Sequence, residues 1–203
     1  TRPCRPAQNS RMPMPWFSAR LLAARLLAAL LMTAGTWPGV SAARAADTYQ
    51  TPDDFLADVF PGGVPPAQVL WLTGDLRTRV AQILGAPPPP RVRYWQQGQR
   101  SAWILDAIGK DQPITAGIVL EAAVIRDVRV LVFRESRGWE VRQPFFTRQF
   151  DGALLDPQGN LNRTVDGITG ATLSVRAMTR MATIALLLGA SRGHTAAVLA
   201  TSP

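Results

Sequence analysis

Residues 114–133 constrain the fold most, because they carry the strongest β signal in the chain. Val, Ile and Leu dominate two runs, 114–125 and 128–133, and such side chains suit the pleated surface of a sheet. Arg126 and Asp127 stand between the two runs and predict the turn of a hairpin. We therefore expect a mainly antiparallel sheet that contains this hairpin.

Two further strands are predicted immediately before the hairpin. Residues 91–96 and 100–108 contain Tyr and Trp at positions that suit a half-buried strand, and residues 97–99 form a turn signal between them. A second turn, at residues 109–113, leads from these strands into the hairpin.

Helices are predicted ahead of these strands. Thr51 as an N-cap and Pro52 in the first turn predict a short helix that ends at residues 61–63. Apolar residues recur at helical spacing over residues 69–84, which predicts a second helix with Gly74 as a candidate break.

The C-terminal third predicts one long helix. Residues 141–150 favour a short helix, residues 151–159 a loop, and residues 175–188 a long apolar helix that ends at Gly189. The expected fold is one α+β domain whose sheet is packed by this C-terminal helix. The chain is divided into a leader (1–45), an N-terminal part of the domain (46–113), a core (114–189) and a flexible tail (190–203).

The net charge of +8 raises the question of nucleic-acid binding. Six of the 22 basic residues precede Ala46, which leaves 16 basic and 14 acidic residues in the rest of the chain. The basic character therefore belongs largely to the leader, and we expect no nucleic-acid partner.

The leader is typical of a secretory signal peptide. Arg20 precedes a short apolar stretch, residues 21–32, and the small residues Ala43 and Ala45 fit a cut just before Ala46. We therefore expect a periplasmic protein. An uncut leader that anchors the chain in the membrane is the alternative, although its uninterrupted apolar segment, residues 26–35, is short for a span.

Cysteine and histidine are too scarce to build a site. Cys4 lies in the leader, which excludes a disulfide or thiol catalysis in the mature chain. His194 is the single histidine, and one histidine cannot build a transition-metal site, so no metal is expected.

Residues 166–174 form a polar turn that leads into the apolar C-terminal helix. Gly167 and Gly170 supply backbone freedom, and Thr or Ser hydroxyls satisfy N–H groups of a first helical turn. Such a turn also suits a phosphate, because unpaired N–H groups and the helix dipole favour an anion. Spacing alone leaves two interpretations open, a phosphate site and an ordinary capped turn without a ligand.

The same stretch resembles the flavin-attachment signature of the FMN-binding domain family, Asp-x-x-Ser/Thr-Gly-Ala-Thr/Ser. The family includes the extracytoplasmic subunits of sodium-pumping and Rnf-type redox complexes. Its members carry FMN as a phosphoester on the last hydroxyl of the signature. The defined positions of the signature are filled by Asp166, Thr169, Gly170, Ala171 and Thr172, so the resemblance implies Thr172 as the acceptor. Ser174 and Thr169 are the alternative acceptors.

The resemblance covers residues 114–189 and extends to a second turn. Residues 135–138, Glu-Ser-Arg-Gly, are similar to the Glu-Thr-x-Gly turn of family members, which adds Glu135 to the expected cofactor-binding residues. Four aromatic residues are candidates for covering the flavin ring, with core packing as the commoner role: Trp95, Trp103, Trp139 and Phe146.

The resemblance implies an exported electron-transfer protein rather than a stand-alone enzyme. Its implied partners are a flavin transferase and a membrane-bound reductase or cytochrome-type protein. Neither a Ser–His–Asp constellation nor a Gly-rich dinucleotide fingerprint is found in the sequence. The alternative function is a non-redox exported binding or assembly module that keeps the fold without flavin. A flavin-dependent reductase is a third possibility, but the chain offers no visible proton donor for it.

Overall fold

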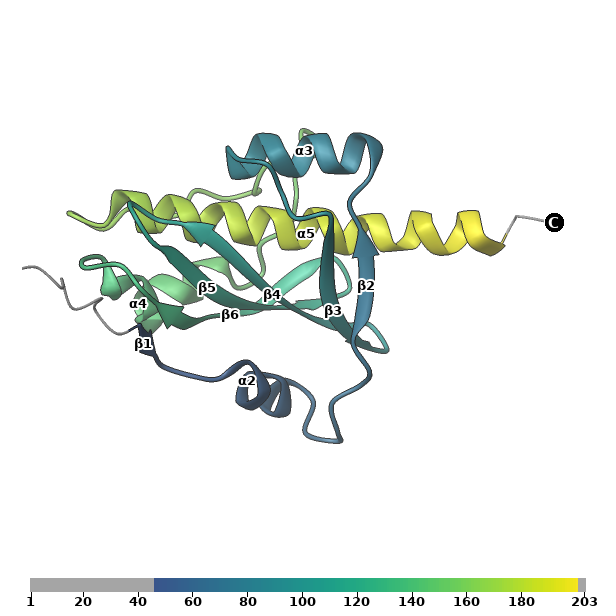
Figure 1. Cartoon of the computed structure of the whole chain (residues 1–203), viewed down its shortest axis with the longest axis horizontal. Helices are drawn as coiled ribbons and strands as arrows, with labels where there is room; N and C mark the ends of the chain where they lie inside the picture. Colours follow the sequence, from purple (N-terminus) through teal and green to yellow (C-terminus); the bar gives the residue numbers. More distant parts are fainter. Residues whose placement is uncertain (1–45, 201–203) are drawn as a thin grey trace, which may run out of the picture. The chain divides into compact units, whose positions relative to one another are not determined.

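The computed structural model of the chain describes residues 46–200, which form six strands, four α-helices and two 3-10 turns (Figure 1). The predicted leader, residues 1–45, and the last three residues lie outside this range. The strands are β1 (Asp47–Thr48), β2 (Gln68–Trp71), β3 (Arg91–Gln97), β4 (Arg100–Ile108), β5 (Pro113–Glu121) and β6 (Val124–Phe133). The helices are α2 (Pro52–Val59), α3 (Gly74–Leu84), α4 (Pro144–Thr147) and α5 (Thr172–Ala200), and the 3-10 turns are η1 (Trp139–Arg142) and η2 (Arg148–Phe150).

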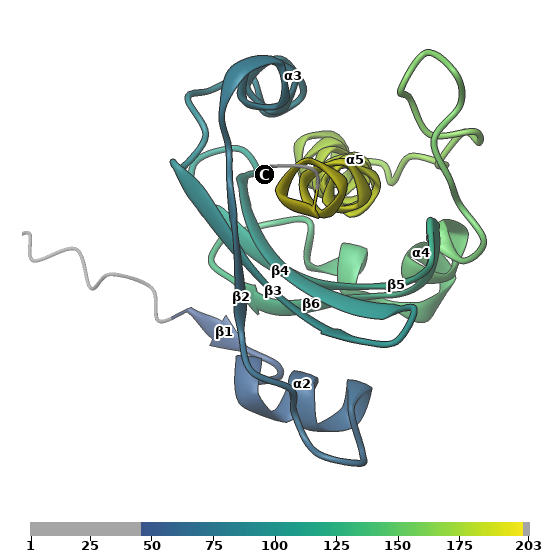
Figure 2. The ribbon, with the colours of Figure 1, turned by 90° about the vertical axis from the view of Figure 1, so that its right-hand side faces the viewer.

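All six strands belong to one antiparallel sheet, in the order β1-β6-β5-β4-β3-β2. α5 packs on one face of this sheet, with α3 beside it, and α2 packs on the opposite face (Figure 2). The predicted α+β fold with a sheet covered by a long C-terminal helix is confirmed.

α2 begins and packs as its sequence predicts. Thr51 is the N-cap, and its Oγ1 accepts a hydrogen bond of 3.1 Å from the backbone N–H of Asp54. Phe55 is fully buried, and a Cβ on Gly117 of β5 would lie only 2.6 Å from its ring. Glycine at this position therefore lets the helix approach the sheet closely, and burial of a ring such as Phe55 stabilises the fold by about 1.5–3 kcal/mol.

α5 is the central core helix. Among residues 46–200, the segment Thr172–Arg192 is the one helix that is long and apolar enough to span a membrane. However, 67% of its apolar stretch is buried inside the protein, as expected for a core helix. The predicted end at Gly189 is wrong, because the helix continues to Ala200. A Cβ on Gly189 would lie 2.7 Å from Cδ1 of Leu120, so this glycine serves close packing against β5. A single glycine destabilises a helix interior by only about 1 kcal/mol, so the buried contacts of α5 are sufficient for the helix to continue past Gly189.

The segment predicted as one helix over residues 69–84 contains a strand and then a helix. β2 pairs with β3, and its side chains alternate, with Leu70 buried and Val69 and Trp71 exposed. Gly74, the candidate break, is the first residue of α3. The short apolar run fits both periods, and pairing with β3 decides for the strand.

The β5–β6 hairpin turns at Ala122 and Ala123, and not at Arg126 and Asp127 as predicted. Ala122 adopts a positive φ of 54°. Arg126 is instead an extra residue in β6, because Val119 pairs with Asp127 while Leu120 pairs with Ile125. A β-bulge of this kind absorbs a polar residue without ending the strand.

The predicted helix over residues 141–150 is divided into η1, α4 and η2. Pro144 separates η1 from α4, because it lacks an N–H and holds the preceding Gln143 in an extended conformation with ψ of 145°.

Candidate functional site

A groove of about 580 Å³ separates the turn after β6 from the N-terminus of α5. The N-terminal end of α5 lies at the same end of the sheet as β1 (Figure 1). Three turns and the first residues of α5 line the groove: Lys110, Glu135, Ser136, Arg137, Gly170, Ala171, Thr172, Leu173 and Ser174. The structure thus brings the predicted Glu135 turn and the predicted attachment motif to one place.

The start of α5 is built without a capping side chain from the residue before it. Ala171 accepts the first helical hydrogen bond, from the N–H of Val175 at 2.9 Å, and is therefore the N-cap residue. Its N–H donates to the carbonyl of Ile168 at 2.9 Å, which closes a tight turn through Gly170 at φ of 82°. Alanine has no side-chain oxygen, so the interpretation of this stretch as an ordinary Thr- or Ser-capped turn does not describe the geometry.

The three candidate hydroxyls differ in access. Thr172, the first residue of α5, is exposed and lines the groove. Ser174 also lines the groove, but it is only 4% exposed, because Gly138 lies over it. Thr169 is exposed but is not among the residues that line the groove.

Glu135 holds the opposite wall together. Its Oε1 accepts hydrogen bonds from three successive backbone N–H groups, those of Lys110, of Asp111 at 2.8 Å and of Gln112 at 3.0 Å. The side chain is 7% exposed, so a buried carboxylate orders the turn between β4 and β5. Glu135 therefore shapes the groove through Lys110 as well as lining it.

Two basic side chains give the groove a positive character. Lys110 and Arg137 both line it, and Lys110 pairs with Asp111 at 3.6 Å with both side chains exposed. The N-terminus of α5 adds the partial positive charge of the helix dipole. This combination favours an anionic group beside Thr172.

Asp166 lies outside the groove. It is exposed, and its backbone N–H donates to the side-chain oxygen of Gln149 at 2.7 Å, which fixes the loop before the motif. Sequence reasoning missed Lys110 as a groove residue. It lies 25 residues before Glu135, and only the folded contact between the two turns reveals it.

One of the four aromatic candidates lies near the groove. Trp103 and Phe146 are fully buried in the core, and Trp95 lies on the face of the sheet that α2 covers. Trp139 is 46% exposed and lines a second hollow, of about 370 Å³, that shares Glu135 and Ser136 with the groove. Within the described residues, no group of His, Cys, Asp and Glu side chains is arranged to hold a metal.

The family comparison agrees with this geometry. The FMN-binding domain model matches residues 109–187, which span the three turns of the groove and the buried part of α5. Residues 109–187 are therefore identified as an FMN-binding domain. The match confirms the resemblance that residues 166–174 predicted.

The other comparisons add little to the assignment of the FMN-binding domain. A solved structure, the crystal structure of Shewanella oneidensis NqrC, is similar at 16% identity and a TM-score of 0.46, over 68% of this chain and 89% of that chain. This likeness is too low for any residue to be carried across. None of the curated proteins matches the chain.

The residues of the groove fit the cofactor. Gly170 leaves open space, with nothing within 4 Å of a Cβ built on it, and Ala171 is small. Lys110 and Arg137 supply donors for a phosphate, and Thr172 supplies an exposed hydroxyl.

Proposed function

We propose that this protein is an exported electron carrier that holds FMN through a phosphoester to Thr172. The observation that carries the proposal is the position of Thr172, an exposed threonine in a basic groove of an FMN-binding domain. Thr172 is not the N-cap residue of α5, because Ala171 occupies that position.

The chain's own residues bind and orient the cofactor. Lys110 and Arg137 neutralise the phosphate charge, while Gly170 and Ala171 let the phosphate approach the backbone. Glu135 keeps Lys110 in place through the turn that it orders. Bound FMN supplies the redox chemistry, in which it accepts electrons from one partner and gives them to another.

Export and covalent attachment belong together in this proposal. Outside the cytoplasm a dissociated flavin is not readily replaced, so an ester keeps the protein loaded. A flavin transferase is the expected loading partner, and a membrane-bound reductase or cytochrome-type protein is the expected redox partner. We expect the leader to be cut before Ala46 and the mature protein to be periplasmic.

The decisive measurement is the intact mass of the protein from the native periplasm, or after co-expression with a flavin transferase. The adduct is expected as a mass increase equal to FMN minus water, mapped to the peptide that contains Thr172. Thr172→Ala is expected to abolish the adduct and Thr172→Ser to retain it. An unmodified peptide under both conditions would exclude the proposal and favour the non-redox module.

Ser174→Ala is the matched control, because it removes a second hydroxyl of the same groove two residues away. It is expected to leave the adduct in place, since Ser174 is 4% exposed beneath Gly138. An adduct that persists in Thr172→Ala but disappears in Ser174→Ala would assign the acceptor to Ser174. N-terminal sequencing of the exported protein tests the cut before Ala46.

A further inference from the structure

β3 and β4 separate after a short paired region. They pair from Tyr94 with Trp103 to Gln97 with Arg100. Beyond this region β3 pairs only with β2, and β4 pairs only with β5. The sheet is therefore open between the two strands at the end that leads away from their turn.

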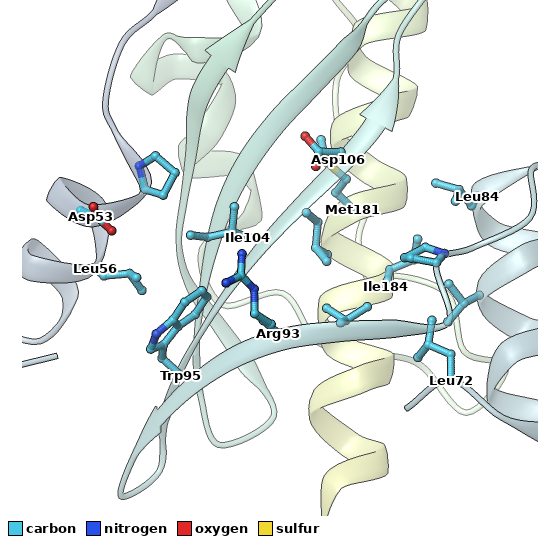
Figure 3. A pocket seen from close by; sticks show the side chains of 15 residues that line it. Asp53, Leu56, Leu72, Leu84, Arg93, Trp95, Ile104, Asp106, Met181 and Ile184 are labelled. Atoms are coloured by element: carbon cyan, nitrogen blue, oxygen red, sulfur yellow. The ribbon is translucent and has the colours of Figure 1, made fainter. Parts of the chain in front are cut away.

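A cavity of about 390 Å³ occupies this opening (Figure 3). Neighbouring residues of both strands line it, Val92 and Arg93 on β3 and Leu105 and Asp106 on β4. Because successive side chains of a strand point to opposite faces, the cavity extends through the plane of the sheet. Its volume is at the lower end of the range for small-molecule sites, about 300–1,000 Å³.

The two ends of the cavity differ in chemistry. The end beneath α5 is apolar, and its lining residues belong to the main core: Leu72, Val80, Val92, Leu105, Met181 and Ile184. The end beside α2 mixes apolar with charged side chains, namely Leu56, Trp95, Ile104, Asp53, Arg93 and Asp106. Figure 3 shows Arg93 between Trp95 and Ile104, with Met181 and Ile184 on the other side.

The charged groups at the α2 end are not equally engaged. Asp106 Oδ1 accepts a hydrogen bond of 2.5 Å from the hydroxyl of Thr115, whose oxygen accepts one of 3.0 Å from Arg134. The side chain of Arg93 makes no hydrogen bond or ion pair with any residue in the described part of the chain. A guanidinium presents several donors in a plane, which match a carboxylate.

From this geometry we infer a second binding site, for an amphiphile with one aliphatic chain and a carboxylate head, such as a free fatty acid. The aliphatic chain of the ligand would lie in the apolar end of the cavity, between α3 and α5, and its carboxylate would bind Arg93 beside α2. The site is separate from the flavin groove, since the two share no lining residue. It therefore stands or falls independently of the proposed function.

Isothermal titration of the purified full chain with octanoate, decanoate and dodecanoate, each below its micelle concentration, tests the inference. Saturable binding at one site per chain is expected, with decylamine and decanol weaker than decanoate. Arg93→Gln removes a charge-assisted hydrogen bond and is expected to weaken decanoate binding by about tenfold or more. Equal binding of the acid, the amine and the alcohol would overturn the assignment of the head group.

Arg91→Gln is the matched control. Arg91 lies on β3 two residues from Arg93 and on the same face, but it stacks over Trp71 at 5.7 Å and does not line the cavity. Its substitution is expected to leave decanoate binding unchanged. An equal loss in both variants would show a general charge effect and overturn the role of Arg93.

Leu84→Phe tests the cavity itself, because Leu84 lines it and is only half buried. The larger ring is expected to abolish binding while the circular dichroism spectrum and the thermal unfolding of the protein stay unchanged. If no fatty acid binds to the unsubstituted protein, or if the filled variant binds decanoate equally well, the cavity is only a packing space between the strands.

Discussion

α2 and α5 both have a threonine near their first turn, and the two helices use it in opposite ways. Thr51 takes the N-cap position, and its Oγ1 accepts a hydrogen bond from Asp54. Thr172 is already helical, and Ala171 takes the N-cap position without a side-chain oxygen. A hydroxyl that closes its own helix terminus is occupied, whereas Thr172 is exposed and lines a basic groove. Where a threonine lies relative to the N-cap therefore separates a stabilising residue from a candidate attachment site.

The largest effect on stability is expected at Glu135, which orders the wall opposite the start of α5. Glu135→Ala leaves three backbone N–H groups without their charged acceptor and is expected to lower the free energy of unfolding by about 3 kcal/mol. Glu135→Gln keeps an acceptor oxygen and is expected to lose less. Urea unfolding measures both. Glu140→Ala is the control, and a loss no larger than in this control would contradict the role of Glu135.

A somewhat smaller loss is expected at Gly138, which packs against the first turn of α5. Gly138 has φ of 88°, and a Cβ there would lie 2.6 Å from Ser174 Oγ. Gly138→Ala therefore combines a left-handed conformation with a steric clash, and about 2 kcal/mol is expected. Gly98→Ala is the control, since Gly98 has φ of 59° and open space around it. Equal losses in thermal unfolding would show that contact with α5 contributes nothing.

The comparison of the two threonines is tested directly by a pair of substitutions. Thr51→Ala removes an N-cap and is expected to cost about 1 kcal/mol. Thr172→Ala removes no cap from the apoprotein and is expected to change stability by less than about 0.5 kcal/mol. Both values come from chemical denaturation of protein without flavin. A larger loss for Thr172→Ala than for Thr51→Ala would reverse the assignment of roles.

The smallest effect is expected at Asp58, which ties α2 to the sheet. The hydrogen bond from Arg129, at 2.7 Å, holds the pKa of Asp58 below its ordinary value of 3.8. A depressed pKa means that the ionised group stabilises the folded state above pH 3.8 and that this stabilisation is lost as the pH falls further. Asp58→Asn is therefore expected to be slightly less stable than the unsubstituted protein at pH 7. The difference should shrink toward pH 3 in urea unfolding, and a constant difference would exclude this ion pair as its source.

Local patterns predicted the elements whose signals lie within a few residues. Thr51 and Pro52 predicted the start of α2, and the aromatic strands on either side of Gly98 were found where expected. The attachment motif was predicted together with Glu135, and the groove brings most of its residues together. Chemical signatures of this kind are local, so they survive without knowledge of the fold.

The failures concern positions that tertiary contacts decide. Gly189 is a stop signal by propensity, yet it lies inside a helix because β5 packs against it. The hairpin turn was mispredicted because Ala122 is not a typical turn residue. Its position is set by the pairing register of β5 and β6 and by the bulge at Arg126, which sequence patterns do not show. Lys110 joins the groove only through a hydrogen bond across 25 residues.

α5 also has a mechanical consequence. Its turns from Val175 to Leu188 are mostly buried between the sheet and α3, and Gly189 brings the helix backbone close to β5. The Cα of Thr172 therefore lies at the end of a helix that core packing holds in place, and it cannot shift far unless the core opens. A group joined to its hydroxyl would move only by rotation about the few single bonds of the link. Its distance to a docked partner would then be nearly the same at every encounter.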